Sequence, residues 1–165
     1  MMKKFALMVP LTAVVFAASF GLTAYAAGDS KTDITALEHK LIAATSGSQA
    51  ITYYDDKNIV LYDFVPPLQY VGGKAVLADF NNFFDNAKDV KGEFLDLDVV
   101  TDGRLGVAHS IQHFTWTGKD GKPMAATVRV TDCWHKVNGQ WKIFHSHISV
   151  PTDPATGKSE MNLKM

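Results

Sequence analysis

The sequence has only one cysteine and almost no net charge, and each of these features excludes a class of protein. It also has no internal repeats. The single Cys133 excludes an internal disulfide framework and any metal site built from several cysteines. The 16 lysines and arginines are balanced by 17 aspartates and glutamates, so the chain lacks the basic surplus of a nucleic-acid-binding protein. With 47% hydrophobic and 20% charged residues among 165, the composition is that of one globular domain.

Long apolar runs are also scarce, and the first segment contains the only one. Residues 1–26 combine two early lysines, an apolar stretch over residues 5–22 and the small residues of Ala24-Tyr25-Ala26. This pattern predicts a secretory signal peptide cleaved before Ala27, and hence a periplasmic or secreted bacterial protein. An uncleaved anchor is the alternative, but a proline, a serine and a glycine interrupt the run. After cleavage we expect no association with a membrane.

The rest of the chain is helical first and strand-rich afterwards, which predicts an α+β fold. Apolar residues at helical spacing predict helices over residues 30–45, 49–55 and 74–87. Thr35 and Glu38 have the spacing of a capping box at the first of them, although Ser30 or Asp33 could equally cap it. Alternating runs between turn residues predict strands over residues 59–65, 92–101, 104–117, 123–136 and 140–150, the last four as an antiparallel meander.

Such a curved antiparallel sheet, wrapped on the N-terminal helices, forms a cone with a pocket at its wide end. We therefore expect one domain over residues 27–151. Residues 152–165 are polar and without period, and they predict a flexible C-terminal tail.

Side chains alternate along each strand, so every strand has two faces. The even-numbered face is aromatic and aliphatic with a few polar groups, which is typical of a pocket lining. The odd-numbered face carries most of the histidines and suits an outer surface through which two copies form a homodimer. The predicted ligand pocket consists of Tyr62, Gln112, Phe114, Trp116, Val130, Trp134, Phe144, Ser146 and Ile148.

The register of the last hairpin has two solutions. A two-residue turn at Asn138-Gly139 pairs Val137 with Gln140 and sets a histidine, His145, opposite Asp132. A three-residue turn that includes Val137 sets Phe144 opposite Asp132. We favour the three-residue turn because it keeps the apolar residues together.

Two carboxylates lie in apolar surroundings and are candidate catalytic residues. Asp132 would lose hydration among aromatic neighbours, which raises its pKa and makes it a hydrogen-bond donor to a developing oxyanion. Asp63, between Tyr62 and Phe64 at a strand end, is a candidate general base for a carbon acid. The structural alternative is that Asp132 pairs with a buried cation and Asp63 is a solvated strand-end residue.

The histidines do not predict a metal site. His145 and His147 share a strand face, but no nearby acid or cysteine completes a ligand set, and His109 and His113 are too far apart along a strand to share an ion. The chain also lacks a glycine-rich phosphate loop, a G-x-S-x-G motif and a cysteine–histidine nucleophile pair. We expect neither a metal nor another cofactor.

Several segments resemble a known family. Residues 53–56 (YYDD), 60–63 (VLYD) and 72–75 (GGKA) resemble the first half of a SnoaL-like domain, and residues 129–149 (RVTDCWHKVNGQWKIFHSHIS) resemble its second half. The second half is also similar to the association domain of calcium/calmodulin-dependent kinase. Both families belong to the nuclear transport factor 2-like superfamily, which includes ketosteroid isomerase. The resemblance implies the cone-shaped α+β fold, a pocket between sheet and helices, and frequent dimers.

The resemblance also bears on the two carboxylates. By position, Asp63 resembles the base of ketosteroid isomerase and Asp132 its protonated acid. The tyrosine that partners them on the isomerase's first helix has no counterpart, because His39 and Lys40 occupy that region. Where the kinase association domain has pocket arginines, this chain has Gln112, Asp132 and Ile148, so the anion-binding version of the pocket is not carried over.

Three hypotheses follow for the function. The first is an exported domain that binds a small, largely apolar molecule in the cone. The second is an isomerase, cyclase or lyase that uses Asp63 as base and Asp132 as hydrogen-bond donor. The third is a non-catalytic dimerisation or interaction module whose interior is filled by its own side chains, among them Phe80 and Phe84.

Overall fold

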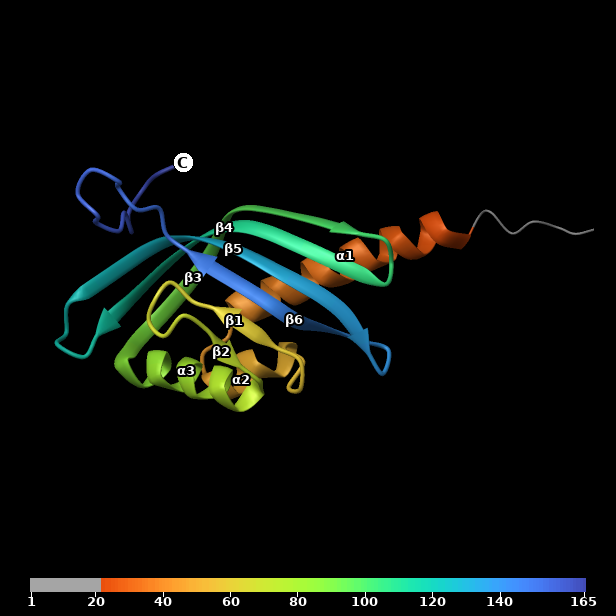
Figure 1. Cartoon of the computed structure of the whole chain (residues 1–165), viewed down its shortest axis with the longest axis horizontal. Helices are drawn as coiled ribbons and strands as arrows, with labels where there is room; N and C mark the ends of the chain where they lie inside the picture. The colour runs from red at the N-terminus through yellow and green to blue at the C-terminus, as the bar shows by residue number, and fades with distance from the viewer. Residues whose placement is uncertain (1–21) are drawn as a thin grey trace, which may run out of the picture.

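The computed structural model describes residues 22–165 (Figure 1). The predicted signal peptide, residues 1–26, therefore lies almost entirely outside the described residues. The first helix, α1 (Leu22–Ile42), contains the predicted cleavage point before Ala27, so cleavage there would leave residues 27–42 of this helix. Within residues 22–165, no helix combines the length and the apolar character needed to cross a membrane.

Three helical segments precede one six-stranded sheet, which confirms the predicted α+β class. After α1 come α2 (Gly47–Ala50), the 3-10 turn η1 (Ile51–Tyr53), β1 (Val60–Tyr62), β2 (Tyr70–Val71) and α3 (Gly73–Asn86). The long strands are β3 (Ala87–Thr101), β4 (Leu105–Gly118), β5 (Pro123–Val137) and β6 (Gln140–Ser149). The sheet order is β2-β1-β6-β5-β4-β3, and the curved sheet bends around the helices (Figure 1).

The helices begin and end for reasons that are visible in the sequence. Ser46 caps α2, since its hydroxyl accepts a hydrogen bond from the amide of Gln49 at 3.2 Å. The predicted capping box at Thr35 is wrong, because α1 begins further upstream and the Thr35 hydroxyl instead donates to the carbonyl of Lys31. Both residues of the predicted box therefore lie inside the helix, where Glu38 faces the sheet and is buried.

The last hairpin corrects the favoured register. Val137 pairs with Gln140 across a two-residue turn in which Asn138 and Gly139 both have positive φ, the geometry of a type I′ turn. A bulge then follows: Trp134 pairs with Ile143, but Cys133 pairs with His145. One extra residue, Phe144, is accommodated between them. The residue opposite Asp132 is therefore Ser146, which neither predicted register gave.

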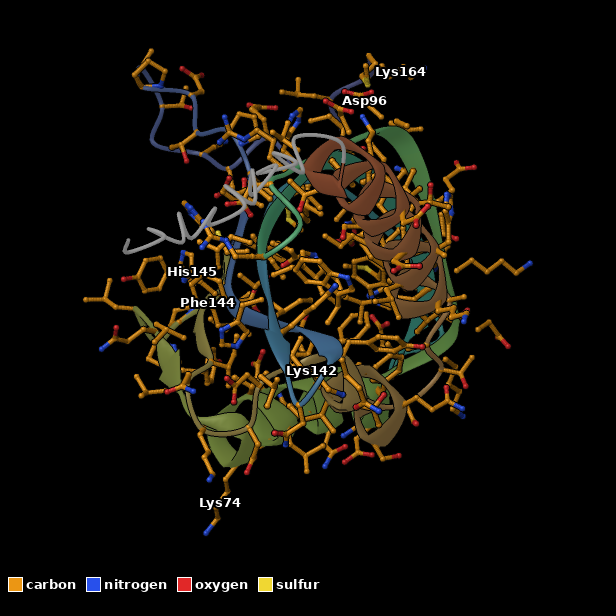
Figure 2. All side chains as sticks on the ribbon, turned by 90° about the vertical axis from the view of Figure 1, so that its right-hand side faces the viewer. Lys74, Asp96, Lys142, Phe144, His145 and Lys164 are labelled. Carbon is orange, nitrogen blue, oxygen red and sulfur yellow. The ribbon has the colours of Figure 1, made fainter. Side chains whose placement is uncertain are left out.

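The bulge changes which residues of β6 face the helices. Trp141 and Ile143 are buried before it, and Ser146 is buried after it. Phe144 and His145 both lie on the other side of β6 from α1 (Figure 2). Phe144 contacts His135 there, with ring centroids 4.8 Å apart, and His145 hydrogen-bonds the carbonyl of Val60 through Nδ1.

The interior divides into two ends. The packed end is the cluster around the fully buried Ile34, Leu61, Val99, Trp134 and Ile143, where α1 lies against the sheet. The hollow end is the cluster of Ala126, Val128 and Val130, with the partly buried Phe114, Trp116, Ile148, Val150 and Met161 around it.

The C-terminal segment after β6 folds back onto the sheet. Thr152 and Ser159 form an isolated bridge, and the amide of Thr127 on β5 donates to the carbonyl of Met161 at 2.6 Å. The side chain of Met161 packs at the hollow end. The segment predicted as a tail therefore supplies part of the wall described next.

Candidate functional site

A cavity of about 480 Å³ occupies the hollow end, between α1, α3 and the inner faces of β4, β5 and β6. Most of its wall is apolar. The aromatic part comes from α3, from β4 and from two residues that follow η1 and β1, because α3 turns its apolar stripe toward the concave face of the sheet. The aromatic lining residues are Tyr54, Phe64, Phe80, Phe83, Phe84, Phe114 and Trp116.

Polar groups gather at the inner wall, where the cavity meets the packed end. Asp132 on β5 and Ser146 on β6 are direct cross-strand partners, and both line the cavity with only 2% and 0% of their surface exposed. Asp132 Oδ1 and Ser146 Oγ are buried with no hydrogen-bond partner among the described residues. Two further buried polar residues, Glu38 and Tyr54, line the same region. A buried group without a partner costs free energy, so this arrangement calls for an explanation.

Burial raises the pKa of the two carboxyl groups at the inner wall, Glu38 and Asp132, so that they keep their protons to higher pH. It raises the pKa of Glu38 to about 9, and the nearby charge of Asp132 adds to the effect. Burial also raises the pKa of Asp132 to about 7. Glu38 has one satisfied oxygen, Oε1, which accepts a hydrogen bond from Trp134 Nε1 at 2.8 Å. At neutral pH Glu38 is therefore a neutral acid, while Asp132 is poised between its two forms.

A second acidic pair lies where the short strand β1 ends. Asp63 lines the cavity and accepts a hydrogen bond from the amide of Phe64 at 2.6 Å through Oδ1. Burial, and after it the charge of Asp79 on α3, raises the pKa of Asp63 to about 7. Asp79 also lines the cavity. A carboxylate with this pKa accepts a proton from a substrate at neutral pH more readily than an ordinary aspartate does.

Most of the predicted pocket residues meet at this cavity. Its lining includes Asp63 and Asp132 together with Gln112, Phe114, Trp116, Val130, Ser146 and Ile148. Along β4 and β5 the even-numbered residues do face inward, because both strands run without irregularity through this region. The two carboxylates, 69 positions apart in the sequence, are thus brought to one cavity by different elements.

Three predicted pocket residues lie elsewhere. Phe144 is turned outward by the bulge, next to His135. Tyr62 neighbours Asp63 on an extended segment and so points the other way, with its ring against His145 and His147 at centroid distances of 4.9 and 5.8 Å. Trp134 lies on the predicted inner face of β5, two residues after Asp132, but it belongs to the packed end, where it hydrogen-bonds Glu38.

The sequence analysis did not assign many of the lining residues to the pocket, among them Glu38, Tyr54, Asp79 and Met161. A signal existed for Glu38, since it lies four residues after the apolar Ile34 and so shares its helix face. Nothing in the local sequence marks the other three, because their inward orientation depends on how η1, α3 and the C-terminal segment dock.

The histidines remain dispersed. His109 approaches Asp98 at 3.8 Å on the outer face, and His113 Nδ1 hydrogen-bonds the hydroxyl of Thr127. Across residues 22–165, no three histidine, cysteine, aspartate or glutamate side chains are arranged to hold a metal ion.

Comparison with known families identifies the class of protein. The SnoaL-like domain family matches residues 24–153, which is most of the chain, so the protein belongs to this family. No curated protein is a significant match to the sequence.

Solved structures place the chain among nuclear transport factor 2-like proteins. One of unknown function from Pseudomonas putida KT2440 is 25% identical with a TM-score of 0.74, covering 84% of this chain and 98% of that one. A superfamily member from Salmonella enterica serovar Typhimurium is 17% identical with a TM-score of 0.65, covering 84% and 99%. A ketosteroid isomerase-like protein from Erwinia carotovora atroseptica is 20% identical with a TM-score of 0.63, covering 73% and 95%. These similarities confirm the predicted superfamily and fold.

Proposed function

We propose that this protein is an exported SnoaL-like domain that binds a small, largely apolar molecule in its cavity. The observation that carries the proposal is the cavity itself: about 480 Å³ walled mainly by aromatic and aliphatic side chains, with a few polar groups at one wall. Sites for small molecules have this size and composition. An interaction module with a solid interior would have filled this space with its own side chains.

A matched pair of variants tests the proposal. Val128 is buried on the cavity wall, whereas Val71 is exposed on β2 and does not line the cavity. Val128→Trp fills the cavity and Val71→Trp does not. Thermal shifts are measured with a library of small apolar molecules, and mass spectrometry identifies any molecule that copurifies. Shifts that Val71→Trp keeps and Val128→Trp loses support the proposal, and an absence of any shift or copurifying molecule contradicts it.

A second candidate function is an acid–base enzyme of the isomerase, cyclase or lyase type. The observation that favours it is that Asp63 and Asp132 line one cavity and both have a pKa raised to about 7 by burial. Asp63 would remove a proton from a carbon acid, and Asp132 in its neutral form would donate a hydrogen bond to the oxyanion that forms.

The catalytic candidate is tested without knowing the substrate. A panel of ketones with acidic protons is incubated with the protein in heavy water, and NMR follows the exchange of protons beside the carbonyl group. The candidate predicts exchange that Asp63→Asn abolishes and Asp132→Asn weakens. An exchange rate equal to that of buffer for every ketone leaves simple binding as the function.

Export and dimerisation complete the proposal. Export predicts that the protein recovered from the periplasm or medium of a bacterial host begins at Ala27, which intact mass measurement checks. For dimerisation, the support is an exposed apolar patch on the outer face, where Val100 on β3 and Val107 on β4 are cross-strand partners and Leu105 lies beside them. Analytical ultracentrifugation of the wild type should give a dimer, and Val107→Asp should give a monomer.

A further inference from the structure

The acidic and basic residues around the cavity are distributed very unevenly. Four carboxyl groups line it: Glu38, Asp63, Asp79 and Asp132. Among the described lining residues there is no lysine, arginine or histidine. Of the lysines labelled in Figure 2, Lys74 projects outward from α3. Lys142 is not part of the lining, and its Nζ donates to the carbonyl of Thr52. Within residues 22–165, no cationic side chain lines the cavity beside these carboxyl groups.

The inner wall leaves hydrogen-bonding capacity unused. Trp134 satisfies one oxygen of Glu38, but Asp132 Oδ1 has no partner although Asp132 is 98% buried. The neighbouring Ser146 Oγ is also buried without a well-formed hydrogen bond, although it lies close enough to Asp132 and Tyr54 to lower the pKa of both. These contacts leave the wall only partly satisfied, which is uncommon for buried groups in folded proteins. A ligand that brings N–H donors or a positive charge to this wall would complete its hydrogen bonding.

The remaining wall favours a cation as well. The faces of aromatic rings carry negative electrostatic potential and attract cations. Tyr54 and Phe80 meet edge to face at 5.3 Å, and Phe83 meets Trp116 in the same way at 5.8 Å, so rings surround the space from several directions. An anionic ligand would face carboxylates and ring faces with no compensating positive side chain.

We infer, building on the binding function proposed above, that the ligand of this cavity is an amphipathic organic cation: an apolar, ring-sized body that carries a protonated or quaternary nitrogen. The apolar body occupies the space among Phe83, Phe114 and Trp116. The nitrogen lies at the inner wall against Asp132 and Ser146. A protonated amine there donates hydrogen bonds to Asp132 Oδ1 and Ser146 Oγ and replaces the missing counter-charge.

The groups that face Asp132 determine how binding depends on pH. The charge of Asp132 acts on Glu38 from α1, on Tyr54, the residue after η1, and on the adjacent Cys133, all of them acids. Asp63 and Asp79 line the same cavity. As pH rises through about 7, Asp132 and Asp63 lose their protons while Glu38 keeps its own up to about 9. The affinity for a cation should therefore rise across this range.

Three probes with one apolar body test the inference: 4-phenylbutylamine, 4-phenylbutan-1-ol and 4-phenylbutanoate. Isothermal titration calorimetry measures their affinities for the wild type. At about pH 8 we expect the amine to bind at least about tenfold more tightly than the alcohol, and the carboxylate to bind most weakly. Lowering the pH to about 5.5 should weaken the amine by about tenfold or more and leave the alcohol unchanged, because the amine itself stays protonated throughout.

Two variants locate the effect. Asp132→Asn should remove most of the amine's advantage over the alcohol, while Asp96→Asn, the same change at an exposed residue of β3, should preserve it. Equal affinity for amine and alcohol in the wild type, or an amine affinity that does not fall at low pH, overturns the cation inference and leaves apolar binding standing. If none of the three probes nor the apolar library binds, both the inference and the proposed binding function are overturned. The pH comparison uses only the wild type, so it decides the matter even if Asp132→Asn fails to fold.

Discussion

The two ends of the interior are built from the same long strands but serve different purposes. At the packed end, α1 presses Ile34 against the sheet, and Trp134 and Ile143 are completely buried. At the hollow end, side chains of similar size, Phe114 and Trp116, are only partly buried and border empty space. The difference teaches that stability and binding are separable here: one end supplies most of the burial, and the other leaves burial incomplete so that a ligand can supply it.

The sharpest test of this separation replaces one tryptophan at each end. Trp134→Ala should reduce the free energy of unfolding by about 3–5 kcal/mol, because it opens a void and leaves buried Glu38 without its donor. Trp116→Ala should cost about 1 kcal/mol, since that ring already borders a cavity. Urea denaturation of both variants measures the difference. Similar losses at the two sites would show that the hollow end contributes to stability as much as the packed end.

Two glycines, one at each end of the interior, give a second comparison, in which we expect smaller losses in the free energy of unfolding. A Cβ at Gly106 would lie 2.4 Å from Cδ1 of the fully buried Ile34, so Gly106→Ala should cost about 2 kcal/mol. A Cβ at Gly92 would lie 2.7 Å from the ring of Phe114, which has the cavity to move into, so Gly92→Ala should cost about 1 kcal/mol or less.

The cause of the Gly106 penalty can be isolated. Ile34→Val removes the clashing Cδ1, so the double variant Gly106→Ala with Ile34→Val should be more stable than the sum of the two single losses implies, by about 1 kcal/mol. The cycle is measured by the same urea titrations. Strict additivity would mean that the clash is relieved in some other way.

The last prediction concerns the acids between the two ends. The folded protein holds the Asp132 proton up to about pH 7 and the Glu38 proton up to about 9, whereas the unfolded chain releases them near 3.8 and 4.5. The folded state therefore binds more protons within this window, and its stability falls as pH rises through it. Asp132→Asn removes the loss of stability that develops between about pH 4 and pH 7. It should therefore stabilise the ligand-free protein at pH 8 by up to about 4 kcal/mol, since a tenfold change in proton affinity corresponds to about 1.4 kcal/mol.

Thermal or urea denaturation from about pH 4 to pH 9 measures this slope, with Asp96→Asn as the control that should leave it unchanged. A loss of wild-type stability toward low pH that Asp132→Asn removes would instead show that Asp132 is paired with a cation in the folded state, since the loss from the other aspartates with lowered pKa values remains in both proteins. That outcome would also remove the electrostatic basis for cation binding.

The sequence predicted the parts of the fold that depend on regular periodicity. Alternation along β4 and β5 assigned Gln112, Val130 and Asp132 to the inner face, because an uninterrupted strand keeps its parity. It failed at Phe144 on β6, because one extra residue there exchanges the faces of the strand, while Ser146 and Ile148 beyond it line the cavity as predicted. A bulge leaves little trace in composition, and both registers considered were free of one.

The candidate site shows the same division between local and tertiary information. Asp63 and Asp132 were recognisable as carboxylates in apolar segments, and the structure brings both to the cavity. Glu38 and Tyr54 complete the inner wall only because α1 and η1 dock at particular positions on the sheet. The periodicity of residues within one helix or strand does not determine where that element docks. The empty space could not be read from the sequence, since the same aromatic residues could have met and filled it.

The placement of Met161 has a consequence for ligand selectivity. This side chain reaches the cavity wall from a segment that follows the last strand, and the amide of Thr127 donates to the carbonyl of Met161. Segments outside helices and strands vary more among relatives than the elements they follow. Relatives with the same strands but a different segment at this position are therefore expected to accept different molecules.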